Sequence, residues 1–165
     1  MKNKMLSLKK GADIDWHLLE TLLHQKFHVH ALTIDREGDR RTHGEIVWAN
    51  SLCSLIKASP VGEDRFWSMT QRRMCCDARR GKCSVREECP AGLIKIVVPI
   101  IIENNVEGFV CVGGRPYVST DRIYTDKIQS DIGLEEEEIQ QCLATIEPID
   151  YRTIKEIMTC ITSFN

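Results

Sequence analysis

The sequence contains no long hydrophobic run and only a weak charge imbalance. None of its apolar stretches approaches the ~20 residues that a membrane-spanning helix needs. The basic N-terminus also lacks the apolar segment of a signal peptide. The formal net charge is −2, which argues against a general nucleic-acid or membrane-surface binder. We therefore expect a cytoplasmic protein without a membrane partner.

Sequence motifs of common enzyme classes are missing as well. The chain has no His-Glu-x-x-His, no Gly-x-Ser-x-Gly and no phosphate-binding glycine loop. Internal repeats and low-complexity tracts are also absent. No spacing pairs one cysteine with one histidine as nucleophile and base. We expect a protein that is not an enzyme, and a thiol- or metal-dependent enzyme is the alternative.

Cysteine is the residue type that the chain has in quantity. Five of its eight cysteines lie between Cys53 and Cys89, in an arginine-rich segment that runs into an apolar stretch. Because disulfides are rare in a reducing cytosol, metal binding, redox chemistry and plain packing remain as explanations. The gaps Cys76-x6-Cys83 and Cys83-x5-Cys89 are longer than those of a zinc knuckle. Metal binding is the favoured interpretation, and the spacing of the cysteines does not decide it.

Four thiolates would suffice for a zinc ion or an iron–sulfur cluster. Adjacent cysteines rarely bind one ion together, and neighbouring arginines would lower the pKa of the thiols. The arginines also leave open a zinc-stabilised nucleic-acid-binding module, although nearby acidic residues make nucleic acid an unlikely partner. The predicted metal ligands are Cys53, Cys76, Cys83 and Cys89, with Cys75 as the alternative to Cys76; Cys111, Cys142 and Cys160 are expected to be packing residues.

The hydrophobic pattern predicts helices packed around one antiparallel sheet. The clearest signal is a hairpin formed by residues 92–102 and 106–114. The two histidines His28 and His30 lie two apart on a predicted strand, which would place both on one face; a partly exposed face is favoured over a pocket or metal. We expect helices at 16–27, 46–56, 66–74, 121–133, 135–146 and 150–161, a strand at 28–35 whose turn at 35–41 favours a hairpin, and an irregular loop up to Glu88.

Several segments resemble the PocR sensory domain, a ligand-sensing module of bacterial and archaeal signalling proteins. They are Ser-Leu-Cys-Ser-Leu-Ile at 51–56, Cys-Pro-Ala-Gly-Leu-Ile at 89–94, Val-Pro-Ile at 98–100, Gly-Phe at 108–109, Gly-Gly at 113–114 and the tail at 134–148. The segment that begins at Cys89 is the most specific of these. The family usually has histidine where this chain has Pro90.

This resemblance implies a single α+β domain, with a PAS-like antiparallel sheet and flanking helices, over residues 13–165, preceded by a mobile N-terminal arm at 1–12. It implies a sensor of a small, weakly polar organic molecule or of a cysteine-ligated metal or cofactor. The signal would pass through the terminal helices to a partner protein or output domain, in a homodimer. The residues expected at the ligand site are Cys53, Cys89, Ala91, Gly92, Leu93 and Pro99.

Overall fold

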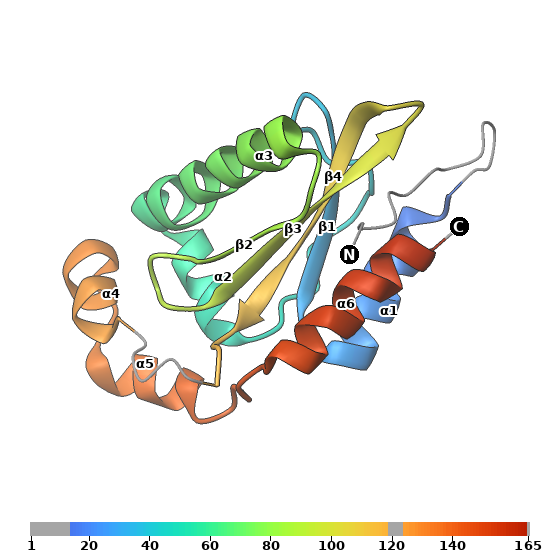
Figure 1. Ribbon diagram of the computed structural model, residues 1–165. Coiled ribbons are helices and arrows are strands. Elements are labelled where there is room, and N and C mark those ends of the chain that lie inside the picture. The colour runs from blue at the N-terminus through green and yellow to red at the C-terminus, as the bar shows by residue number, and fades with distance from the viewer. Residues whose placement is uncertain (1–13, 119–123, 165) are drawn as a thin grey trace.

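The computed structural model describes residues 14–118 and 124–164, and the predicted arm at 1–12 lies outside them. The described residues form one antiparallel sheet, in the strand order β1-β4-β3-β2, with helices around it (Figure 1). The predicted α+β fold with a PAS-like sheet is confirmed. The elements are α1 (Trp16–Phe27), β1 (His30–Asp35), α2 (Ser51–Ala58), the π-helix η1 (Gly62–Ser68), α3 (Met69–Gly81), β2 (Val85–Glu88), β3 (Ile94–Ile102), β4 (Asn105–Arg115), α4 (Thr125–Ile132), α5 (Glu136–Leu143) and α6 (Tyr151–Ser163).

Strands β3 and β4 form the central hairpin that the sequence predicts. Their β-branched residues suit a pleated, buried sheet. The turn residues Glu103 and Asn104 both have positive φ, 48° and 69°, as the two central residues of a type I′ turn require. Because β4 also pairs with β1, it lies inside the sheet and is hydrogen-bonded on both sides.

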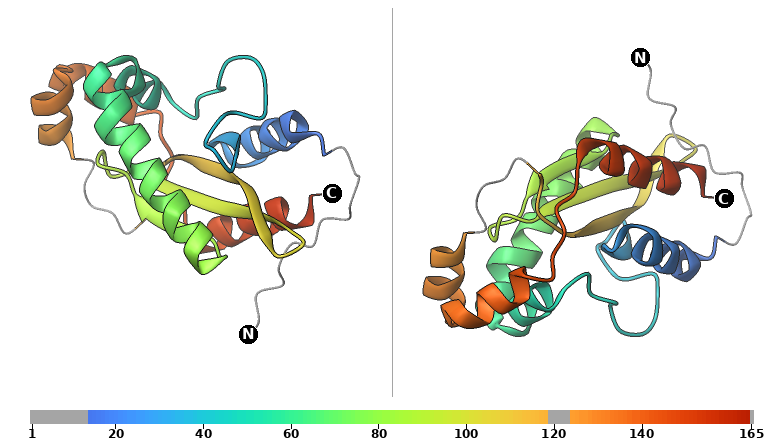
Figure 2. Two further views of the ribbon diagram at one scale, coloured as in Figure 1. Left: turned by 90° about the horizontal axis from the view of Figure 1, so that it is seen from above. Right: turned by 90° about the horizontal axis from the view of Figure 1, so that it is seen from below.

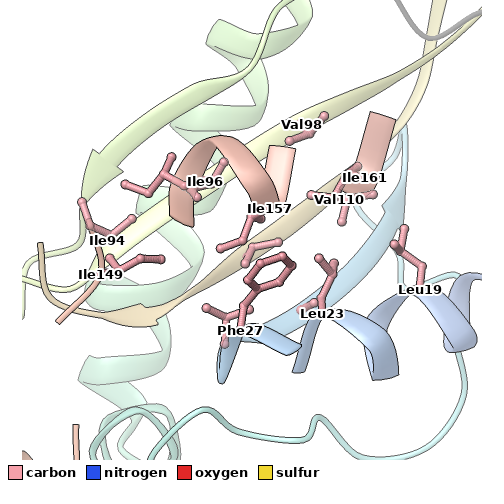
Figure 3. Packing of buried hydrophobic residues seen from close by; sticks show 14 of the residues in the cluster. Leu19, Leu23, Phe27, Ile94, Ile96, Val98, Val110, Ile149, Ile157 and Ile161 are labelled. Atoms are coloured by element: carbon pink, nitrogen blue, oxygen red, sulfur yellow. The ribbon is translucent and has the colours of Figure 1, made fainter. Parts of the chain in front are cut away.

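The two faces of the sheet are covered by different helices. Alternate residues of β3, such as Ile96 and Val98, pack against Leu23 of α1 and Ile157 of α6 (Figure 3). The residues between them point the other way, and Val97 packs against α3. In Figure 2, α3 crosses the sheet seen from above, and α6 crosses it seen from below. The terminal helices and α3 are therefore separated by the sheet.

A third apolar cluster lies at the end of the sheet away from the β3–β4 turn, where α4 and α5 are drawn in Figure 1. Helices α2, η1, α4 and α5 meet there, and the hydroxyl of Ser51 donates to the Cys142 thiol at 3.2 Å. Ala91, in the turn between β2 and β3, is fully buried in this cluster. The cluster therefore places α2 and η1 over the turn at Cys89.

The hairpin predicted after β1 is present only as a short antiparallel pairing, without a second strand. One bridge joins Ile34 and Arg40, the Asp35 N–H donates to the Asp39 carbonyl at 2.8 Å, and the Arg41 N–H donates to the Thr33 carbonyl at 2.9 Å. Beyond this pairing, the Thr33 N–H donates to a carboxylate oxygen of Glu20 at 2.6 Å. The hydroxyl of Thr42 donates to the same carboxylate at 3.0 and 3.1 Å. The buried carboxylate therefore accepts hydrogen bonds at an edge where a longer second strand would have paired.

Two other expectations about local structure need correction. The helix expected at 46–56 begins only at Ser51, because the Asn50 side chain caps it by accepting the Cys53 N–H at 2.8 Å. The segment expected to end in an irregular loop continues as α3 and then β2. Only Thr70, Met74 and Ala78 of α3 are buried. With so few buried positions among many arginines, the sequence of α3 shows no clear helical spacing of apolar residues. The three helices predicted after Pro116 are present as α4, α5 and α6, and residues 121–123 of the first prediction lie outside the described part.

Candidate ligand-binding cavity

A small cavity of about 30 Å³ lies between the sheet and the helices α2 and η1. It opens on the α3 side of the sheet, opposite the terminal helices. Polar groups from three strands form its floor, and apolar side chains such as Ile56, Phe66 and Leu93 form much of its wall. A volume of this size holds about two or three water molecules. The cavity therefore suits a ligand with few non-hydrogen atoms.

The floor of the cavity is one row of residues across three strands. His30 of β1 and Lys95 of β3 are both paired with Gly113 of β4, so all three share one face of the sheet. Because Gly113 has no side chain, the space between the imidazole and the ammonium group stays open. A Cβ atom on Gly113 would lie 3.2 Å from His30 Nε2, and one on Gly114 would lie 2.8 Å from His30 Nδ1. Both glycines therefore create room around the imidazole.

His30 is 4% exposed and stands against two indole rings. Its ring centroid is 5.3 Å from that of Trp48 and 5.3 Å from that of Trp67. Burial, followed by the charge of Lys95, lowers the pKa of His30 to about 3, so the ring is neutral at pH 7. Its Nδ1 has no hydrogen-bond partner among the described residues. The expected pairing with His28 is wrong, because His28 ends α1 in a left-handed conformation and is exposed.

Lys95 is also 4% exposed, although it carries an amine. Its Nζ lies 4.3 Å from the Trp67 ring centroid and 3.4 Å from the Trp67 carbonyl oxygen. No ion pair joins it to a carboxylate of the described residues. Burial lowers the pKa of Lys95. A lysine in this environment is costly to bury unless something supplies the missing partner.

Two of the predicted residues, Cys53 and Cys89, line the cavity wall. Burial raises the pKa of Cys53 to about 12 and also raises that of Cys89. Asn50 holds Cys53 in place, since its amide caps α2 and also donates to the Gly114 carbonyl at 2.5 Å. The Cys89 N–H donates to the Leu93 carbonyl at 2.7 Å, which closes the turn. Both thiols are therefore neutral wall groups at pH 7.

The four predicted metal ligands are not brought together. Cys76 is exposed on α3 and lines a different cleft from Cys53 and Cys89, and Cys83 is exposed near α6. The continuous helix α3 causes this separation, because it carries its cysteines away from the β2–β3 turn. The described residues contain no group of three or more His, Cys, Asp or Glu side chains that could hold a metal ion. The zinc or iron–sulfur centre stays a prediction without an assembled ligand set.

The alternative ligand Cys75 packs in the apolar cluster between α3 and the sheet. A hydrogen bond with the thiol of Cys111 lowers the pKa of Cys75 and raises that of Cys111. Cys111 and Cys142 are buried, Cys160 is half-buried, and all eight cysteines are free thiols. The first two therefore behave as the packing residues that we expected.

The structure places the six predicted ligand-site residues in three ways. Cys53, Cys89, Ala91 and Leu93 line the cavity. Gly92, with φ 85°, shapes the adjoining turn. Pro99 lines a separate cleft beside α6, because it lies four residues beyond Lys95, about 13 Å along the strand.

Sequence reasoning missed Lys95, Trp48 and Trp67 and misjudged His30. Lys95 did carry a signal, since it is the only charged residue between Glu88 and Glu103 in a stretch of buried strand residues. Such a residue is seldom buried without a function or a partner. The two tryptophans carried no such signal, because the predicted helices at 46–56 and 66–74 that contain them do not indicate a contact with His30.

Comparison with protein families identifies the family of the chain. The family model described as the sensory domain found in PocR matches residues 18–165. The chain belongs to the PocR sensory-domain family. This confirms the resemblance and assigns the chain a sensory role, to which a buried cavity with polar groups at its floor is suited. No curated protein and no solved structure matches the chain. Among the helices of the described residues, none has the length and apolar character needed to cross a membrane.

Proposed function

We propose that this PocR sensory domain is a cytoplasmic sensor that binds a small organic molecule in the cavity above His30, Gly113 and Lys95. The observation that carries the proposal is the pair of buried polar groups on its floor. His30 Nδ1 has no described partner, and Lys95 Nζ has only the face of the Trp67 ring and a long contact to the Trp67 carbonyl oxygen. Because buried polar groups are almost always hydrogen-bonded, a ligand that supplies partners to both is strongly favoured.

The dimensions of the cavity restrict the ligand to a very small molecule. Pockets for drug-sized ligands have volumes of roughly 300–1,000 Å³, whereas this cavity measures about 30 Å³. The half-buried side chains of Trp67 and Lys57 stand at its wall. We infer that the ligand is a short aliphatic compound with one polar end, and that the wall at Trp67 moves to admit it.

Arg115 provides a physical link from the cavity to the terminal helices. It lies two residues after Gly113, and its guanidinium group donates to the Phe27 carbonyl at 2.7 Å, where α1 ends. It also donates to the carbonyls of Glu147 at 2.9 Å and Pro148 at 2.6 Å, just before α6. We infer that a shift of the β4 floor on ligand binding moves both terminal helices. These helices would pass the signal to a partner protein, an output domain or a second copy of the chain.

The free state of all eight cysteines supports the proposed cytoplasmic location, because free thiols persist in a reducing compartment. Two arginines of the cysteine-rich segment lie against acidic side chains. Arg73 is hydrogen-bonded to Glu87, and Arg80 lies 3.9 Å from a carboxylate oxygen of Asp77. This engagement favours a small-molecule sensor over a nucleic-acid-binding module.

Titration of a compound panel followed by amide NMR tests the proposal. The panel comprises propan-1-ol, propionamide, acetone and sodium propionate. We expect at least one compound to shift the amide signals of Gly113, Gly114, Lys95 and the 89–93 turn, with smaller shifts in α1 and α6. If none of the four shifts these signals, or if the shifts concentrate at a different cleft, the proposed site is incorrect.

Two matched variants then test the position of the site. Cys89→Ser introduces a hydroxyl into the apolar wall, and Cys83→Ser makes the same change at an exposed position outside the cavity. We expect the first variant to weaken binding of the active compound several-fold, because the hydroxyl has to be desolvated. The second should bind like the wild type. Equal affinities in both variants would place the ligand elsewhere.

A further inference from the structure

We propose that the cavity selects a short-chain monocarboxylate, whose two oxygens accept hydrogen bonds from Lys95 Nζ and His30 Nε2. This inference rests on the proposed function, because it assigns a charge class to the ligand of the same cavity. The proposed function requires only a small organic ligand, and a neutral one would satisfy it.

The first argument is that Lys95 lacks a counter-ion. The other lysine near Trp67, Lys57, forms an ion pair with Glu63. Lys95 has no such partner among the described residues, and the neighbouring thiols Cys53 and Cys89 are neutral at pH 7 because burial raises their pKa. A buried ammonium group is stable only when it is paired and hydrogen-bonded. An anionic ligand would complete the pair.

The second argument is the arrangement of the donors. His30 and Lys95 stand on strands on either side of Gly113, so both side chains border the gap that the glycine leaves. A neutral imidazole carries a single N–H, and Nε2 is the ring nitrogen beside the gap, because a Cβ on Gly113 would lie 3.2 Å from it. With the proton at Nε2, the two donors border the gap from the strands on either side. A carboxylate has two acceptor oxygens, one for each donor.

The third argument is the shape and polarity of the remaining wall. Beyond the floor, the cavity is bounded by Ile56, Phe66 and Leu93, which suit a short alkyl chain. The volume of about 30 Å³ holds about two or three non-hydrogen atoms, so a carboxylate with one or two further carbons enters when the wall at Trp67 moves. Acetate and propionate need the smallest movement, whereas amino acids and aromatic acids need a larger one.

Isothermal titration of the full chain with matched compounds tests the assignment. The probes are sodium propionate, its neutral isostere propionamide and the longer sodium hexanoate, each at the same ionic strength set with sodium chloride. We expect propionate to bind, and propionamide and hexanoate to bind about tenfold more weakly or not at all, because hydrogen bonds to charged groups are the stronger ones. If propionamide binds as tightly as propionate, the carboxylate assignment is overturned while the proposed site stands.

Two lysine variants provide the control. Lys95→Met removes the charge but keeps an unbranched stem, and Lys155→Met makes the same change on the exposed surface of α6. We expect Lys95→Met to lose about tenfold or more in propionate affinity, with a melting temperature equal to or above that of the wild type, because an unpaired buried charge is removed. Lys155→Met should bind propionate normally. Unchanged propionate binding in Lys95→Met, or an equal loss in both variants, would refute the proposal.

Discussion

Single thiols of the protein differ in exposure and in pKa, and these differences predict their reactivity. Cys76 and Cys83 are exposed, whereas Cys53 is half-buried at the cavity and the burial of its thiol raises its pKa to about 12. Because the thiolate is the reactive form, we expect iodoacetamide at neutral pH to label Cys76 and Cys83 first. The labelling rates of Cys53 and Cys89 should be lower by a factor of about one hundred or more. Peptide mass spectrometry of a labelling time course measures the order, and early labelling of Cys53 or Cys89 would contradict a closed cavity.

His30 makes the stability of the domain sensitive to acid. Its pKa is about 3 in the folded protein, against 6.5 for an ordinary histidine. Between these values the unfolded chain binds a proton that the folded chain does not, so the free energy of unfolding falls as the pH drops below 6.5. The slope from this residue approaches about 1.4 kcal/mol per pH unit.

The variant His30→Gln removes this proton and isolates its contribution. We expect its free energy of unfolding to fall less steeply than that of the wild type over the same pH interval, when both are measured by urea unfolding. Lys95 and His24 also act on His30, but both remain in the variant and contribute equally to the two curves. Parallel curves would show that His30 is not buried in neutral form.

The sequence identified part of the cavity at this scale. Cys53, Cys89, Ala91 and Leu93 were recognised because the family resemblance marks the turn that contains most of them. The sequence did not identify His30 and Lys95 as cavity residues. They meet at the cavity because both pair with Gly113, and strand pairing between distant segments is not visible in local patterns. The four predicted metal ligands lie apart in the described residues for the same reason, since α3 separates cysteines that are close in sequence.

Residues at the ends of helices affect the stability of the fold. His28, which follows the last residue of α1, allows this effect to be tested. His28 follows α1 with φ 53°, in the left-handed region, and its N–H donates to the His24 carbonyl at 2.9 Å. Glycine adopts this conformation without the steric penalty of a Cβ. We expect His28→Gly to raise the free energy of unfolding by about 0.5–1 kcal/mol, measured by urea unfolding at neutral pH.

The same substitution at His17 is the control, because that residue lies inside α1 with helical neighbours on both sides. Glycine there should lower the free energy of unfolding by a few tenths of a kcal/mol. A decrease at both positions would show that His28 contributes interactions beyond the backbone conformation of the helix end.

Elements with strong local signals were predictable, and elements determined by tertiary contacts were not. The β3–β4 hairpin combines β-branched runs with a short turn, and α6 combines a capping Asp150 with isoleucines at helical spacing, so both followed from the sequence. The strand β1 makes only a short pairing with the segment that follows it, and its long pairing is with β4. Its Thr33 N–H donates to Glu20, a residue of the preceding helix whose role no local pattern reveals.

The whole molecule is organised so that the cavity and the terminal helices occupy opposite faces of one sheet. Each strand of the floor therefore contributes to both: Lys95 faces the cavity, and Ile94 and Ile96 on either side of it pack in the cluster of α1 and α6. A ligand at the cavity has two routes to these helices, through the sheet itself or through Arg115 at its edge. The two routes make different predictions.

Arg115 is the more direct route, because one guanidinium group contacts both the end of α1 and the segment before α6. We expect Arg115→Met to retain ligand binding, since Arg115 does not line the cavity. The variant should lose the ligand-induced change in hydrogen exchange at the start of α6. Its free energy of unfolding should fall by about 1–3 kcal/mol, because three backbone carbonyls, among them the part-buried one of Phe27, lose a charged donor. Hydrogen-exchange mass spectrometry with and without propionate measures the response.

Arg152→Met serves as the comparison, because Arg152 also lies near the start of α6 but is exposed and pairs only with Glu156 at 3.3 Å. This variant should transmit the ligand response as the wild type does. If Arg115→Met transmits it equally well, the coupling runs through the packing of Ile94 and Ile96 against α6. A response lost in Arg115→Met and kept in Arg152→Met would establish the edge of the sheet as the connection between cavity and output, because only the edge contact differs between the two variants.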